Sequence, residues 1–218
     1  MHHFFTTEST APPVIPLLWY GVMVLLILMA VWASLRYYQN EQFRKIFRNL
    51  QIFQLICLYI WYFAFQLPWS NSLPLYHCRL AMFAVLLLPD RWKSKQFFAL
   101  MGVSGAIFAL GYPVFDPYTF PHITSFSFLL GHYCLLVNSL IYLLRRYDSS
   151  LLKNREIVLY TFFLDMFLVG VNQVTGGNYG LMARPPIIKG DSLLVNYVVV
   201  SSILAAALLL FNVFFSRR

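Results

Sequence analysis

The sequence predicts an all-α polytopic membrane protein, and three observations lead to that fold class. Of the 218 residues, 60% are hydrophobic and only 11% are charged, and the mean hydropathy is +0.66. Roughly a quarter of a soluble domain is charged, so this chain has too few polar residues to cover a water-exposed surface. The apolar residues form continuous runs of the length that a membrane helix needs, without the alternation of a membrane barrel. Disorder is excluded because it requires low hydrophobicity and high charge.

Seven apolar runs are predicted to cross the membrane as helices, joined by short links that contain proline, glycine or charged residues. In order they cover residues of about 17–37, 50–68, 73–89, 96–113, 123–144, 156–175 and 191–215. The first run has no basic residues before it and exceeds the apolar core of a signal peptide, so we expect an uncleaved anchor. The whole of 17–215 is expected to be one bundle, between an extracellular tail (1–16) and a cytoplasmic tail (216–218).

The apolar runs differ in the small and polar residues that they contain. The fourth has the small residues Gly102, Gly105, Ala106 and Ala109 at helical spacing, which indicates a close helix-packing face. The third, fifth, sixth and seventh carry polar residues, which are rare and expensive inside a membrane.

Basic residues alternate between the links. Thirteen lysines and arginines fall on one side of the predicted bundle and two on the other. The excess marks the cytoplasmic side, which places the N-terminus outside and the C-terminus in the cytoplasm of a cell-membrane protein. The net charge of +8 is thus explained by topology, and nucleic-acid binding is not expected.

The polar residues of the spans are predicted to converge in the outer half of the membrane. At about 1.5 Å per helical residue, His77 lies roughly 6 Å deep, Arg79 roughly 9 Å, His132 about 13 Å and Asp165 about 15 Å. Asn172 shares the face of Asp165, because the two are seven residues apart. A polar residue in a membrane span is a functional hypothesis by default.

Each of these residues also has a purely structural interpretation. Arg79 and Asp165 are expected to interact as an ion pair, directly or through Asn172 or water. His132 is either a proton-transfer group or a buried histidine with a hydrogen bond. Cys78 is either a nucleophile or a small buried apolar residue. Cys57 and Cys134 have no polar neighbours in the sequence and are assigned to packing, and no metal or other cofactor is expected.

The link after the sixth run contains Thr175-Gly-Gly-Asn-Tyr-Gly180. Its glycines permit sharp turns. It lies on the same side as the polar residues, so it is either a lid over them or an ordinary turn.

Three motifs together resemble the YwaF-like bacterial integral membrane proteins. They are LPLYHCRLAM (73–82), GHY (131–133) and N-x-x-TGGNY (172–179) with the RPP that follows. That family is similar to a eukaryotic transmembrane acyltransferase that acts on phospholipids. The resemblance implies a catalytic histidine at His132 and a cysteine in the first motif. Here Cys78 follows His77, whereas in the acyltransferase the cysteine precedes the histidine.

Three functions are compatible with these observations. The first, which we favour, is a membrane-embedded enzyme for acyl transfer or ester hydrolysis on lipids. His132 would be its general base or acid, and Cys78 its nucleophile. The supporting or substrate-binding residues would be His77, Arg79, Asp165, Asn172 and Asn178. The second is a binding or transport protein for a lipid, ion or small solute, and the third is a membrane scaffold. Membrane lipids are the expected partners.

Overall fold

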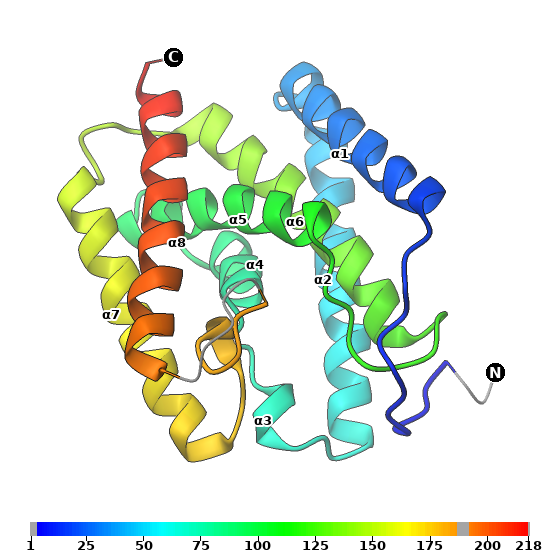
Figure 1. Ribbon diagram of the computed structural model, residues 1–218. Coiled ribbons are helices and arrows are strands. Elements are labelled where there is room, and N and C mark those ends of the chain that lie inside the picture. Colours follow the sequence, from blue (N-terminus) through cyan, green and yellow to red (C-terminus); the bar gives the residue numbers. More distant parts are fainter. Residues whose placement is uncertain (1–3, 187–191, 218) are drawn as a thin grey trace. The chain divides into compact units, whose positions relative to one another are not determined.

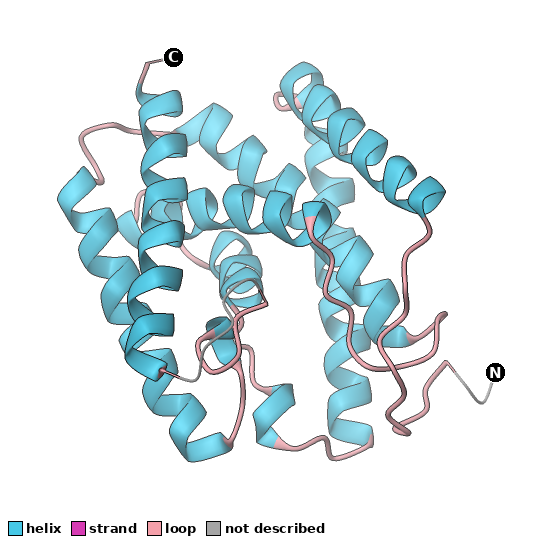
Figure 2. Ribbon diagram, viewed as in Figure 1, coloured by secondary structure: helices cyan, strands magenta, loops and turns pink. Residues whose placement is uncertain are grey.

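The computed structural model describes residues 4–186 and 192–217, and the regular structure in these ranges is entirely helical (Figure 2). Figure 1 labels the α-helices. They are α1 (Leu17–Tyr37), α2 (Glu41–Ala64), α3 (Trp69–Ser72), α4 (His77–Leu87), α5 (Lys93–Gly111), α6 (Ile123–Arg146), α7 (Asn154–Thr175) and α8 (Leu193–Ser216), with a 3-10 turn, η1 (Tyr179–Leu181), after α7. Among the described residues six helices are long and apolar enough to cross a membrane, namely α1, α2, α5, α6, α7 and α8.

The chain divides into two compact units. The first unit combines the described residues of 1–66 with 105–145, and therefore holds α1, α2 and most of α6. The second unit combines 67–104 with the described residues of 146–218, and holds α3, α4, most of α5, α7, η1 and α8.

In the first unit, α2 and α6 are joined by hydrogen bonds in their interior. The Ser127 hydroxyl donates to Gln54 Oε1 at 2.7 Å, and Asn138 Nδ2 donates to the carbonyl of Phe47 at 3.1 Å. These groups would be costly in lipid without partners, so the bonds help to hold the two helices together.

The tail before α1 folds back on the first unit through backbone groups. The amide of Thr10 donates to the Pro117 carbonyl at 2.7 Å, and the amide of Ile123 donates to the Phe4 carbonyl at 3.0 Å. His122 is fully buried and contacts the Thr6 carbonyl through Nε2 at 3.0 Å. The tail is thus an ordered part of this unit.

In the second unit, α7 and α8 pack side by side (Figure 1). Near one end of the pair Asn212 Nδ2 donates to Asn154 Oδ1 at 2.8 Å. Further along, the Tyr197 hydroxyl donates to the Phe162 carbonyl at 3.1 Å. The two antiparallel helices are therefore joined by hydrogen bonds at two heights.

Five of the predicted spans agree with long helices to within two or three residues at each end, and the other two differ. Helix α2 begins at Glu41, nine residues before the predicted start, because the Asn40 side chain caps it and Lys45 pairs with Glu41 at 2.7 Å. The third predicted span, 73–89, is wrong as a single helix. Residues 73 and 76 have extended backbone, and only the 11 residues of α4 are helical.

The sequence explains this break. Pro74 has no amide hydrogen for a helix and pushes the residue before it into extended conformation. Leu73 accordingly has φ −67° and ψ 148°, and Tyr76 caps α4 with φ −69° and ψ 140°.

Candidate functional site

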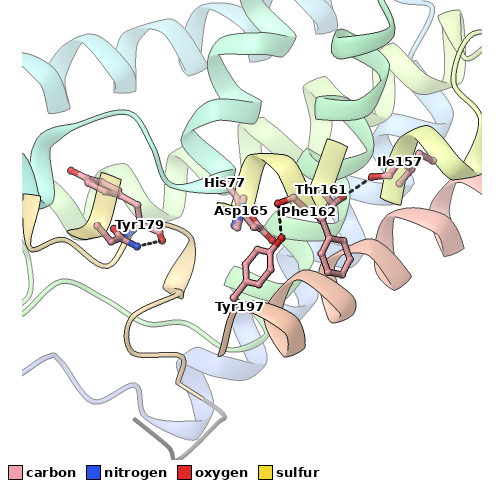
Figure 3. Close-up of polar contacts among 8 residues, drawn as sticks. His77, Ile157, Thr161, Phe162, Asp165, Tyr179 and Tyr197 are labelled. Atoms are coloured by element: carbon pink, nitrogen blue, oxygen red, sulfur yellow. Dashed lines mark hydrogen bonds and ion pairs between the residues drawn. The ribbon is translucent and has the colours of Figure 1, made fainter. Parts of the chain in front are cut away.

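The centre of the second unit holds a histidine and a carboxylate in direct contact. His77 Nε2 lies 2.6 Å from Asp165 Oδ1, and Asp165 is completely buried whereas the His77 side chain is 15% exposed (Figure 3). An ionised carboxylate only accepts hydrogen bonds, so Nε2 donates and the lone pair of the neutral ring is on Nδ1. This is the arrangement that orients a histidine for proton transfer.

Within the described residues, Asp165 does not form the ion pair that was expected with Arg79. The guanidinium of Arg79 lies 5.1 Å from the centre of the Tyr76 ring, and its Nη1 donates to the Asn71 carbonyl at 3.4 Å. Asp165 Oδ2, the oxygen that faces away from His77, has no hydrogen-bond partner within the described ranges.

The loop after α7 folds back into the unit and is held by Asn172. The side chain of Asn172 accepts from the Tyr179 amide at 2.7 Å and donates to the Tyr179 carbonyl at 2.8 Å. Asn178 binds the same loop further on, accepting from the amides of Ala183 and Arg184 and donating to the Arg184 carbonyl. Both amides proposed for substrate binding are therefore engaged in loop structure.

Tyr179 connects this loop to the break before α4. Its buried side chain accepts a hydrogen bond from the amide of Leu73 at 3.0 Å, and its hydroxyl donates to the Trp69 carbonyl. The ring packs edge-on against Tyr76 with 5.0 Å between centroids. Tyr179 thus satisfies backbone groups that the extended segment cannot pair by itself.

Gly180 brings the loop directly against the histidine. Its φ is +67°, a left-handed conformation that favours glycine. A methyl group at this position would lie 3.0 Å from His77 Cε1 and 2.9 Å from Leu168 Cδ1. The loop after α7 therefore packs against His77 and Leu168 in the second unit.

Cys78 directly follows His77 at the start of α4 and is partly exposed. Successive helical residues point about 100° apart, so the thiol and the imidazole leave the helix in different directions. Cys57 is also partly exposed, and Cys134 is buried.

His132 lies in the first unit, on α6. Its Nδ1 contacts the Phe128 carbonyl at 2.7 Å, and its ring packs against Phe128 with 4.4 Å between centroids. A carbonyl only accepts, so Nδ1 donates and Nε2 carries the lone pair of the neutral ring.

The pairing of His77 with Asp165 was missed because every residue after Leu73 was given a helical rise. Residues 73–76 are not helical, so a helical rise does not give the depth of His77. Pro74 was the signal in the sequence that the helical rise did not apply.

No curated protein and no solved structure matches the chain. A family model described as the TMEM164 family matches residues 4–215, nearly the whole length. The chain is thus a multi-pass membrane protein that belongs to the TMEM164 family.

Proposed function

We propose that this protein is a membrane-embedded enzyme that acts on lipid acyl groups, with His77 as a general base oriented by Asp165. The observation that carries the proposal is the 2.6 Å contact between His77 Nε2 and Asp165 Oδ1 in the interior of the second unit. A lipid substrate reaches a site inside the bilayer without crossing water.

The proposed chemistry is a proton transfer coupled to attack on an ester carbonyl. His77 Nδ1 takes a proton from the nucleophile, the nucleophile bonds to the acyl carbon, and the ester C–O bond breaks. His77 then returns the proton to the departing alcohol oxygen. Asp165 stabilises the imidazolium that exists between these two steps.

Cys78 is the proposed nucleophile, and because its thiol and the His77 imidazole leave α4 in different directions, a water molecule passes the thiol proton to His77 Nδ1. Its thioester would pass the acyl group to a lipid hydroxyl in a second step with the same proton movements. If water attacks instead, the product is a free fatty acid.

The test uses the purified full chain in liposomes that contain a phospholipid with an isotope-labelled acyl chain and an unlabelled lysolipid. We expect His77→Gln to lower the appearance of transferred or free labelled acyl chain by about 10²- to 10⁴-fold, as loss of a general base does. Cys78→Ser should abolish transfer while Cys57→Ser, a change at the other partly exposed cysteine, leaves it intact. Absence of both products in the native protein, or full activity of His77→Gln, would refute the proposal.

His132 is the alternative base, supported by the Nδ1 bond that leaves its Nε2 as the basic nitrogen. The variant His132→Gln tests it separately. Loss of activity in His132→Gln with retention in His77→Gln assigns the proton transfer to the first unit.

We also propose the seven-span topology, with the N-terminus outside the cell membrane and the C-terminus in the cytoplasm. The 11 helical residues of α4 cover about 16.5 Å of the roughly 30 Å hydrocarbon core, and the non-helical segment before α4 would have to cover the rest. Non-helical backbone is tolerated at this depth when it is buried in protein. A cysteine introduced before Leu17 should be labelled from outside intact cells, and protection of that site would contradict the topology.

A further inference from the structure

The first two turns of α2 carry two arginines that form no ion pair within the described residues, Arg44 and Arg48. Glu41 is the nearest carboxylate in the sequence, and it pairs with Lys45 at 2.7 Å. The side chain of Arg44 is partly exposed, but its Nε is buried and has no hydrogen-bond partner in the described chain. Because buried parts of charged groups are normally paired, the two arginines indicate a binding place for an anion.

Gln51 lies on the same face of α2 and is also without a partner. It follows Arg44 by seven residues and Arg48 by three, a spacing that places the three side chains on one face of a helix. Gln51 is 1% exposed, and neither Nε2 nor Oε1 has a hydrogen-bond partner among the residues described. Helical side chains lean toward the preceding turn, so the amide is directed toward Arg48. This buried amide is a second, independent indication of a polar ligand.

The distance between the arginines and the amide selects the kind of ligand. Arg44 and Gln51 are about 10.5 Å apart along the helix axis. One inorganic phosphate is too small to contact both, whereas a phospholipid has phosphate oxygens at one level and ester carbonyls several ångströms deeper. Arginine binds phosphate through two parallel hydrogen bonds. The amide of Gln51 can donate to an ester carbonyl and accept from a hydroxyl.

The level of this face relative to the membrane also favours a lipid. Helix α2 begins at Glu41, but its apolar run begins only at about residue 50. The arginines therefore lie before the hydrocarbon core, and Gln51 lies at its edge. Two apolar side chains near this level are exposed, Ile46 by 46% and Trp32, near the end of α1, by 61%. Tryptophan is enriched where acyl chains meet headgroups.

We propose that this face of α2, formed by Arg44, Arg48 and Gln51, binds an anionic phospholipid whose headgroup carries a hydroxyl. The arginines hold the phosphate, and Gln51 binds an ester carbonyl and the hydroxyl. The positive end of the helix dipole adds to the attraction. The topology proposed above places this site in the cytoplasmic leaflet, where basic segments attract anionic lipids. The site is independent of the acyl chemistry and is tested without an activity assay.

The experiment is thermal unfolding of the purified full chain in an uncharged detergent with phosphatidylglycerol or, at the same mole fraction, phosphatidylcholine. A ligand that binds only the folded state raises the midpoint. At about ten times the dissociation constant, phosphatidylglycerol should give a midpoint about 3 to 6 °C above that in phosphatidylcholine. Inorganic phosphate, compared with chloride at equal ionic strength, should raise the midpoint much less, because it cannot contact both the arginines and Gln51.

Two variants test the site. Arg44→Gln removes one charge, and Gln51→Leu removes an uncharged amide that has no partner in the described chain, so its fold should be intact. The matched control is Arg155→Gln, which removes the same charge from an exposed arginine in the first turn of α7, also on the predicted cytoplasmic side. The rise in phosphatidylglycerol should persist in Arg155→Gln and be largely lost in the other two variants.

Equal midpoints in the two lipids, or an undiminished rise in Gln51→Leu, would overturn the proposal. The second result would show that anionic lipids are attracted by net charge alone. A rise in inorganic phosphate equal to that in phosphatidylglycerol would assign this face to a soluble phosphate compound and would also overturn the lipid as its ligand.

Discussion

Replacement of Gly180 by alanine measures how closely the loop after α7 packs on His77. The substitution has two costs. The first is conformational, because Gly180 has a φ of +67° and a residue with a Cβ loses about 1–2 kcal/mol in the left-handed region. The second is steric, because the new methyl group would lie 2.9 Å from Leu168 Cδ1 and 3.0 Å from His77 Cε1.

The matched control is Gly176→Ala. Gly176 has nearly the same φ, +71°, but a methyl group there has no atom within 4 Å. Gly176→Ala therefore carries the conformational cost alone. Overpacking of a buried site typically adds 1–3 kcal/mol, so Gly180→Ala should destabilise the protein by about 2–5 kcal/mol and Gly176→Ala by about 1–2 kcal/mol.

Thermal unfolding in detergent supplies the assay. For a chain of about 200 residues, 1 kcal/mol corresponds to roughly 2–4 °C in the midpoint. We expect Gly180→Ala to unfold at a clearly lower temperature than Gly176→Ala, and the proposed acyl activity to fall further because the imidazole is displaced. Equal midpoints for the two variants would show that position 180 has free space, and would refute the packing of this loop on His77.

Three further outcomes are expected. Asn172→Ala leaves two buried backbone groups of Tyr179 without partners and should cost about 2–5 kcal/mol in unfolding free energy, whereas Asn178→Ala, which loses two exposed bonds and one part-buried bond, should cost less. Burial lowers the pKa of His122 below its ordinary value of 6.5, so its stabilising effect is complete above pH about 6.5 and is lost as the pH falls through the lowered value. Hydrogen exchange at the Thr10 amide should accordingly speed up below that pH, beyond the intrinsic change, and His122→Gln should remove this dependence. Lys95→Met removes bonds to the Leu88 carbonyl and to Asp90 and should lower the unfolding midpoint, whereas a midpoint equal to that of the native protein would assign no stabilising role to this buried amine.

The fold could be predicted where one physical requirement dominates. Runs of about 20 apolar residues have to be helical in lipid, because every backbone group needs a partner. That requirement is sufficient to predict the helices α1 and α6–α8. It fails at α2, where Arg44, Lys45 and Arg48 were assigned to a link although they lie on the first two turns of the helix.

The site was less predictable because it depends on contacts between residues far apart in sequence. Asp165 was correctly recognised as a buried group that needs a partner, but Arg79 was chosen by charge and not by position. The tail before α1 carries no polar pattern, and its contacts with the loop before α6 run largely through backbone carbonyls that no side-chain motif reveals.

The double role of the Tyr179 hydroxyl has a consequence for biosynthesis. The groups that it pairs, the Trp69 carbonyl and the Leu73 amide, leave the ribosome 110 and 106 residues before it does. At about 5–20 residues per second, this interval is on the order of 5–20 s. During that time the extended entry to α4 has no internal partner for these groups and cannot be stable in lipid. The third segment should therefore reach its final position only after α7 and its loop have been made, and chains that end before Tyr179 should leave it accessible from water.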